Sequence, residues 1–195
     1  MPASRLDPLE PPYDPAIADM LAKTMPPGWP DTKPLALFRT LARHEALAEA
    51  FFGFGRFFIS LRADSGSVLD LRSRELVILR ITARSGCAYE WGVHARLFAE
   101  AADLDGASLD RLAGRLDPSD WNPRDHALLS AVDELDRGAR LSDAAWRALS
   151  RHYDEKAVLE ILLLAGWYRA IAYLANGPQI AGETWAAALP QGDPD

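Results

Sequence analysis

The 195-residue sequence predicts an all-α domain, and three observations support this class. Apolar residues recur at helical spacing from residue 35 onward, capping residues precede most of these segments, and glycine or proline follows several of them. No stretch shows the alternation of apolar and polar residues that marks a strand. A composition of 49% hydrophobic and 25% charged residues is typical of globular proteins, and the length suits one domain.

The first 34 residues contain nine of the fourteen prolines. Proline lacks a backbone donor and disfavours helix at the residue before it. We therefore expect residues 1–34 to form a mostly extended arm, with at most one short helix at 15–23. The arm would lie over the domain or over a neighbouring subunit, or else be a disordered tail. The helical domain is expected at 35–187, followed by a short tail at 188–195.

The domain is expected to open with a helical stretch at 35–60, rich in leucine, alanine and phenylalanine. Gly53 and Gly55 lie inside it, where they would either let helices approach closely or break the helix in two. The next helices are predicted at 71–84, between an Asp70 cap and a stop at Gly86, then at 87–102 and 108–115. The last three are predicted to follow caps at Asn122, Ser142 and Asp154 and to extend to about residues 137, 151 and 176.

Composition also argues against several classes of function. The net charge of −7 disfavours binding to nucleic acid, which requires many contacts from lysine and arginine to phosphates. The first residues lack the apolar core of a signal peptide, and the longest apolar stretch, 157–175, carries Glu160 and Arg169, so we expect a buried helix and no membrane partner. Motifs typical of phosphate loops, zinc sites and serine nucleophiles are absent. A single cysteine leaves no intrachain disulfide, and a cytoplasmic location is the default expectation.

One predicted helix carries an unusual mixture of side chains on one face. With about 100° per residue, Glu90, Trp91, His94 and Phe98 all lie close to the direction of Cys87. An ordinary amphipathic helix would place leucine and valine there. Separately, Cys87 and His94 would be typical of buried core residues. Together with Glu90 they favour the wall of a functional pocket, in which Trp91 would contact substrate.

Spacing limits what these residues can do. Glu90 and His94 are four residues apart, which permits a direct hydrogen bond. Cys87 lies about 10 Å from His94 along the axis, so the two do not form a thiol–imidazole pair unaided. The helix N-terminus would lower the pKa of Cys87 and burial would raise it, which leaves the net direction open.

Neighbouring helices supply further candidates. Glu75 lies on the apolar side of helix 71–84 and needs a partner there; the tight turn at Ser85 and Gly86 makes His94 a reasonable one. On the last helix, Arg169 and Tyr173 share a side and are candidates for binding a carboxylate substrate. Arg169 could equally neutralise Glu75.

The segment ELVILRITARSGCAYEWGVH carries a resemblance to a known family. It contains Glu75, eleven residues, Cys87, two residues, Glu90, three residues and His94. This pattern resembles the alkylhydroperoxidase D motif, with Glu90 in place of the second cysteine. The flanking RSRELVILR and LLLAGWYRAIAYLANG are similar to carboxymuconolactone decarboxylase-like proteins, and the resemblance extends over about residues 35–185.

The resemblance implies an alkylhydroperoxidase D-like helical bundle that forms homo-oligomers, trimer-based or dimeric, and that uses neither a metal nor an organic cofactor. In alkylhydroperoxidase D the glutamate and histidine of the motif tune a pair of redox cysteines. Here Glu75, Cys87 and His94 are present, but the cysteine that attacks the peroxide is missing. The decarboxylase branch generally uses acid/base residues on a cyclic lactone acid.

Three hypotheses follow. The preferred one is an enzyme that performs acid/base chemistry (decarboxylation, lactone opening or isomerisation) on a small organic acid or carbonyl compound, with His94, Glu90 and Glu75 in a proton relay. The second is a hydroperoxide reductase that uses Cys87 and an external thiol. The third is an oligomeric binding protein without catalytic activity.

Overall fold

The computed structural model describes residues 4–24, 33–59 and 66–191, and within them all regular structure is helical. This confirms the predicted all-α class. The chain order is α1 (Pro15–Ala22), α2 (Ala36–Leu41), α3 (Glu45–Ile59), α4 (Leu71–Arg84), α5 (Ala88–Phe98), α6 (Gly106–Ala113), a short 3-10 helix η1 (Pro118–Asp120), α7 (Pro123–Gly138), α8 (Asp143–Ser150) and α9 (Glu155–Asn176).

Side-chain caps at the helix starts confirm the predicted boundaries of four helices. The side chain of each capping residue accepts a hydrogen bond from the backbone N–H three residues later, which satisfies one of the free donors of the first turn. The pairs are Asp70 with Ser73, Asn122 with Asp125, Ser142 with Ala145, and Asp154 with Ala157.

Of the two alternatives left open for Gly53 and Gly55, the break in the helix is wrong, because α3 continues through both glycines. The chain turns earlier, at residues 42–44, where Arg43 and His44 donate to the carbonyls of Thr40 and Leu41. A glycine inside a helix costs only about 1 kcal/mol, which burial of the phenylalanines of α3 in the core can offset. The helix predicted at 87–102 also ends early, at Phe98.

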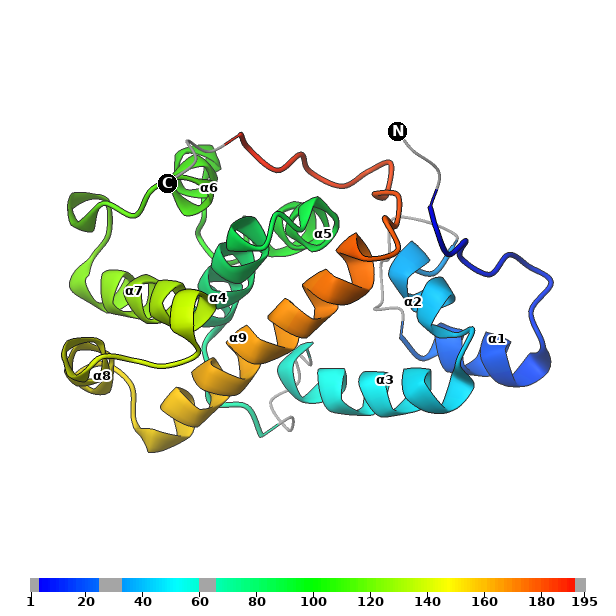
Figure 1. Ribbon diagram of the computed structural model, residues 1–195, viewed down its shortest axis with the longest axis horizontal. Coiled ribbons are helices and arrows are strands. Elements are labelled where there is room, and N and C mark those ends of the chain that lie inside the picture. The colour runs from blue at the N-terminus through cyan, green and yellow to red at the C-terminus, as the bar shows by residue number, and fades with distance from the viewer. Residues whose placement is uncertain (1–3, 25–32, 60–65, 192–195) are drawn as a thin grey trace.

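Helix α4 is the centre of the fold and packs against α5, α6, α7 and α9. Figure 1 shows α9 beside α4, with α6, α7 and α8 at one end of the molecule and α1, α2 and α3 at the other. Arg80 of α4 is buried and forms two hydrogen bonds with Asp133 of α7, at 2.6 and 2.7 Å, so its charge is compensated inside the core. Among the described helices, α9 is long and apolar enough to cross a membrane by length and composition alone, but half of its apolar window is buried inside the structure.

Segments outside the helices pack on this core from both ends of the described chain. Near the N-terminus, backbone N–H groups of Arg5 and Leu9 donate to the carbonyls of Pro178 and Arg39. The C-terminal segment, residues 180–191, leaves the end of α9 and passes over α5 towards α6 (Figure 1). Leu189 packs against the core, so contacts with the domain continue past residue 187. Residues 1–3, 25–32 and 192–195 of the predicted arm and tail lie outside the described residues.

Candidate active site

A tight turn joins α4 to α5 and sets the position of Cys87. Gly86 adopts a left-handed conformation (φ 57°), which favours glycine because it has no Cβ, and the N–H of Cys87 donates to Thr82 O at 2.8 Å. Cys87 is the N-cap residue of α5, so Glu90 and His94 follow in its first two turns. The predicted face of α5 is therefore directed towards the interior, where Cys87, Glu90, Trp91 and His94 are all buried.

The predicted contact between Glu75 and His94 is present. Nδ1 of His94 lies 2.8 Å from Oε2 of Glu75 across the interface of α4 and α5. The other oxygen of the same carboxylate accepts a hydrogen bond of 2.8 Å from Nε of Arg74, which is also buried. Glu75 therefore has a cationic partner on one side and an imidazole on the other, as a fully buried carboxylate requires.

Tyr168 of α9 completes the contacts of the imidazole and is absent from the residues predicted from the sequence. Its hydroxyl lies 2.9 Å from Nε2 of His94, and both residues are buried. The sequence does offer one indication of this role. Tyr168 shares a side of α9 with Ile161, Leu164 and Ala165, and a tyrosine buried on such an apolar side needs a hydrogen-bond partner for its hydroxyl. The predicted residues of α9, Arg169 and Tyr173, lie on other sides of the helix.

These contacts determine the proton arrangement on His94. A carboxylate only accepts hydrogen bonds, so Nδ1 carries a proton towards Glu75. Nε2 is then free to accept from the Tyr168 hydroxyl. Oε2 of Glu90 lies 3.7 Å from Nε2, which is too long for the predicted direct hydrogen bond but close enough for electrostatic coupling. One imidazole nitrogen therefore faces both a second carboxyl group and a phenol.

Burial changes the acidity of the groups around Nε2. Loss of solvent is the main cause that raises the pKa of Glu90 to about 6; the nearby Glu183 adds to it and His94 opposes it. Burial, followed by the charges of Glu90 and Glu75, raises the pKa of the Tyr168 hydroxyl well above its ordinary value. Near neutral pH, Glu90 therefore exchanges a proton readily, while Tyr168 remains a neutral hydrogen-bond donor.

Cys87 is fully buried in the described structure, and its environment favours the neutral thiol. Burial is the largest cause that raises the pKa of Cys87 to about 12, and the charge of Glu90 adds to it. Backbone N–H groups of Tyr89 and Glu90 oppose the shift without reversing it. The direction that the sequence left open is therefore upward.

The C-terminal segment lies across α5 beside these groups. Ala187 N donates to Gly92 O at 3.1 Å, and a Cβ added at Gly92 would stand 2.4 Å from Ala187 O. Only glycine permits this approach of two backbones. Glu183 accepts hydrogen bonds from the Tyr89 hydroxyl at 2.5 Å and from Ala36 N at 2.7 Å, which links the segment to both α5 and α2.

The structure places Arg169 and Tyr173 outside this cluster. Arg169 pairs with Asp136 of α7 and donates to Ser85 Oγ at 3.1 Å, while Tyr173 is largely exposed. The alternative that Arg169 neutralises Glu75 is wrong, because Arg74 occupies that place. Binding of substrate by Arg169, Tyr173 or Trp91 stays a prediction, and the ion pair of Arg169 with Asp136 does not favour it for Arg169.

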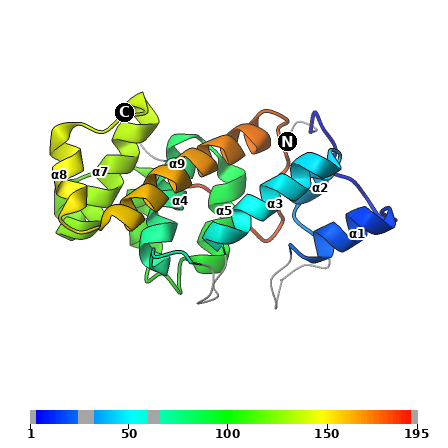
Figure 2. The same cartoon turned by 90° about the horizontal axis from the view of Figure 1, so that it is seen from below.

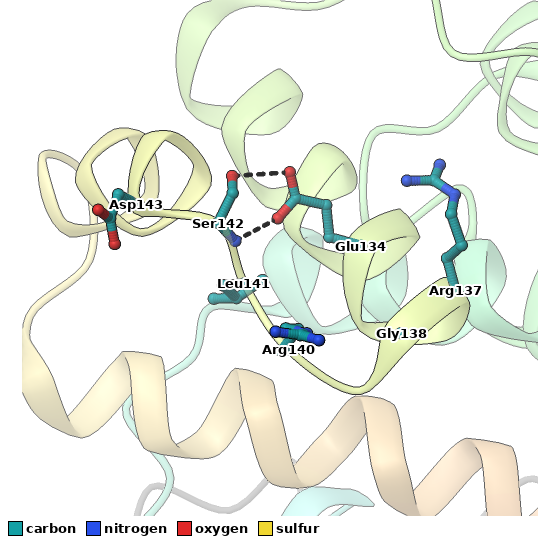
Figure 3. A pocket seen from close by; sticks show the side chains of 7 residues that line it. All are labelled: Glu134, Arg137, Gly138, Arg140, Leu141, Ser142 and Asp143. Atoms are coloured by element: carbon teal, nitrogen blue, oxygen red, sulfur yellow. Dashed lines mark hydrogen bonds between the residues drawn. The ribbon is translucent and has the colours of Figure 1, made fainter.

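A surface hollow lies elsewhere, between the end of α7 and the start of α8. It is lined in part by Glu134, Arg137, Arg140 and Ser142. Figure 3 shows that the backbone N–H and the hydroxyl of Ser142 both donate hydrogen bonds to the carboxylate of Glu134. None of the residues around His94 contributes to this hollow. Within the described ranges, no group of three or more His, Cys, Asp or Glu side chains is placed to hold a metal ion.

The model of the carboxymuconolactone decarboxylase family matches residues 46–134, which include Glu75, Cys87, Glu90 and His94. The solved structure of a peroxidase-related protein from Ralstonia eutropha, described as an alkylhydroperoxidase AhpD core, has the same fold, with a TM-score of 0.70, 18% identity and coverage of 93% of this chain and 95% of that one. Residues 46–134 therefore match the carboxymuconolactone decarboxylase family, and the chain has the fold of an alkylhydroperoxidase D-like protein.

Two further solved structures share this fold. A peroxidase-related protein from a Silicibacter species superposes with a TM-score of 0.73 at 14% identity, covering 94% of this chain and 95% of that one. The debrominase Bmp8 superposes with a TM-score of 0.71 at 15% identity, covering 92% of each chain. A search of curated proteins found no match. At these identities the structural likeness establishes the fold alone.

Proposed function

We propose that the protein is an acid/base enzyme that moves a proton on a small organic acid or carbonyl compound, in a decarboxylation, lactone opening or isomerisation. The observation that carries the proposal is the geometry at His94. Oε2 of Glu75 lies 2.8 Å from Nδ1 and holds the proton there, while Nε2 faces Glu90 and Tyr168. An imidazole held in one tautomer between a carboxylate and a proton source is a typical general base.

Each group has a defined part in the proposed chemistry. Nε2 of His94 takes a proton from the substrate, and the resulting imidazolium is stabilised by Glu75. Glu90, whose pKa of about 6 lets it carry a proton near neutrality, returns one to the developing anion. Tyr168 donates its hydrogen bond to Nε2 before the substrate binds, and to the developing anion once Nε2 is protonated. The imidazolium then passes its Nε2 proton to Glu90, whose Oε2 lies 3.7 Å away, so that both groups return to their starting states.

Substrate entry requires a displacement, because Cys87, Glu90, His94 and Tyr168 are all buried in the described structure. The C-terminal segment is the best-placed element to move. It has no helix of its own, and it contacts α5 through the pair of Ala187 and Gly92 and the pair of Glu183 and Tyr89. Opening of such a segment and exclusion of water on closure are common features of enzymes with buried sites.

Exchange of substrate hydrogen for deuterium tests the proposal and does not require that the product be identified. A panel of small lactone acids, β-keto acids and enolisable carbonyl compounds is incubated with the protein in D2O and followed by NMR. We expect exchange or turnover with at least one compound, and a loss of about 10²-fold or more in His94→Gln and Glu90→Gln. Cys87→Ser should retain activity. Unchanged turnover in both the His94 and Glu90 variants would contradict the proposal.

A second candidate is a thiol-dependent peroxide reductase. It is favoured by the backbone N–H groups of Tyr89 and Glu90, which act to lower the pKa of the Cys87 thiol, and by the peroxidase-related names of two fold neighbours. The thiolate would attack the peroxide to give a sulfenic acid and an alcohol, and two external thiols would then restore Cys87 and release water and a disulfide. The raised pKa of Cys87 argues against it. Consumption of an alkyl hydroperoxide with dithiothreitol, abolished in Cys87→Ser, would establish this function.

A further inference from the structure

The C-terminal segment is tied to two helices by a single carboxylate oxygen. Oε1 of Glu183 accepts hydrogen bonds from the Tyr89 hydroxyl of α5 at 2.5 Å and from Ala36 N of α2 at 2.7 Å. Figure 1 and Figure 2 show the segment leaving the end of α9 and passing between α5 and α2. The segment has no helix of its own, so its position over α5 depends on contacts of this kind.

The contact with Ala36 replaces a cap that the sequence next to α2 does not provide. Leu35 is the N-cap residue of α2, and its apolar side chain accepts no hydrogen bond from the first turn. Glu183 takes this place from 147 positions away along the chain. The Tyr89 hydroxyl accepts from Leu37 N at 3.1 Å, so the carboxylate and the phenol together satisfy two donors at the start of α2. Displacement of the segment would leave both helices without this acceptor.

Glu183 also affects the ionisation of Glu90. Burial raises the pKa of Glu90 to about 6, His94 opposes the shift, and the negative charge of Glu183 adds to it. On α4, Glu75 is paired with Arg74 at the Nδ1 side of the imidazole. The titratable groups whose charge acts on Glu90, or that Glu90 acts on, are Cys87, Tyr89, His94, Tyr168 and Glu183. Because Glu183 belongs to the C-terminal segment, its distance from Glu90 changes when that segment moves.

We propose that Glu183 is a positioning residue of the proposed reaction, which holds the C-terminal segment over α5 and keeps the proton on Glu90 while the segment is closed. The proposal rests on the role of Glu90 as proton donor in the proposed function. Closing removes water from Glu90 and brings the carboxylate of Glu183 near it, and both effects favour the protonated form. By linkage, loss of that proton favours the open segment, because the two carboxylates then repel each other. Glu90 therefore holds its proton when the segment encloses a substrate.

Titration of the Glu90 carboxyl group by carbon-13 NMR tests the effect of Glu183 and requires no substrate. The resonance is identified by its absence from the spectrum of Glu90→Gln. We expect a midpoint near pH 6 in the wild type. In Glu183→Gln the midpoint should be lower by about half a pH unit or more, because the amide oxygen can still accept both hydrogen bonds but carries no charge. Glu100→Gln, at an exposed position after the end of α5, is the matched control and should leave the midpoint unchanged. Equal midpoints in the wild type and Glu183→Gln would overturn the proposal.

Hydrogen exchange at the Ala187 amide tests whether closing of the segment is linked to the proton on Glu90. This amide donates to Gly92 O in the closed segment, so its protection factor measures the closed population. The protection factor should fall in the wild type as the pH rises through about 6. It should depend less on pH in Glu90→Gln. A wild-type protection factor that stays constant between pH 5 and pH 7 would also overturn the proposal.

Tyr89→Phe tests the hydrogen bond that holds the segment and retains the charge of Glu183. We expect the protection factor of the Ala187 amide to fall about tenfold at pH 5, because one buried hydrogen bond is lost. Tyr153→Phe, which removes a buried hydroxyl that contacts α4, is the matched control and should retain the protection. Equal protection in the two variants would contradict the role of Glu183 in holding the segment. None of these measurements uses a substrate, so their outcomes are separate from the deuterium-exchange screen that tests the proposed function.

Discussion

Nδ1 of His94 lies 2.8 Å from Oε2 of Glu75, while Nε2 of the same ring lies 2.9 Å from the Tyr168 hydroxyl. The imidazole is therefore held at both nitrogens by side chains from two other helices. Its orientation depends on the packing of α4, α5 and α9 together, and each of these contacts can be removed separately.

Tyr168→Phe removes the hydroxyl and keeps the ring. We expect the turnover number with a substrate found in the deuterium screen to fall by on the order of 10²-fold, because Nε2 loses its donor. The pH profile should move as well, which a purely structural effect would not produce. Tyr153→Phe is the matched control, since that buried hydroxyl contacts Ser73 and not His94, and the variant should retain full activity. Equal activities of the two variants would contradict the assignment of Tyr168.

Glu75→Gln tests the buried ion pair of Glu75 with Arg74. The variant leaves the Arg74 guanidinium buried without a carboxylate, and removal of one partner of such a pair typically costs about 3–5 kcal/mol. Urea unfolding followed by circular dichroism measures the loss of stability. Glu100→Gln, at an exposed position after the end of α5, is the control. Similar unfolding midpoints for both variants would show that the ion pair contributes little.

Glu90 gives stability a defined dependence on pH. Because burial raises the pKa of Glu90 from 4.5 to about 6, the folded chain holds this proton to a higher pH than the unfolded chain does. Its stabilising contribution is fully present below pH 4.5 and is lost as the pH rises through about 6, by on the order of 2 kcal/mol. Glu90→Gln should lack this decrease, whereas Glu100→Gln should keep it. If the free energy of unfolding of the wild type instead rises relative to that of Glu90→Gln as the pH passes from 4.5 through about 6, the upward shift in the pKa of Glu90 is refuted.

Cys87 should react slowly with thiol reagents in the native protein. Its sulfur is buried and the pKa of its thiol is raised to about 12, so little thiolate is present at pH 8. Ellman's reagent should label one thiol per chain within minutes in 8 M urea and far more slowly without denaturant. Rapid stoichiometric labelling of the folded protein would instead support the peroxide reductase.

Gly92→Ala tests the contact between α5 and the C-terminal segment. The new Cβ would stand 2.4 Å from Ala187 O, a distance that forces the segment to shift. We expect a loss of about 1–3 kcal/mol and faster proteolysis after residue 180, measured by urea unfolding and limited digestion. Gly106→Ala is the control, since no atom lies within 4 Å of its added Cβ. Identical digestion patterns for the two variants would show that the segment is not held at Gly92.

Features that depend on neighbouring residues were predictable from the sequence. Asp70 and Asp154 cap their helices through local contacts, so their pattern is visible in the chain itself. The contact of Glu75 with His94 was also accessible, because the two helices that carry them are joined by the turn at Gly86. Replacement of a redox cysteine by Glu90 likewise directed attention to acid/base chemistry.

Contacts between distant parts of the chain were not predictable in the same way. Tyr168 and His94 are 74 positions apart, and the apolar pattern of α9 does not show which of its sides faces α5. The approach of Ala187 to Gly92 depends on the path of a segment with no helical pattern. Arg74 was overlooked as the partner of Glu75 because sequence neighbours on a helix usually point in different directions. Here its long side chain folds back to the carboxylate.

The imidazole of His94 on α5 contacts side chains of both α4 and α9, so its surroundings depend on the packing of all three helices. The motif from Glu75 to His94 can be present and helical while α9 is detached, yet the hydroxyl at Nε2 would then be missing. The rate of the proposed reaction should thus report the docking of α9. Warming should abolish that rate at the temperature where near-ultraviolet circular dichroism is lost, before the far-ultraviolet signal declines.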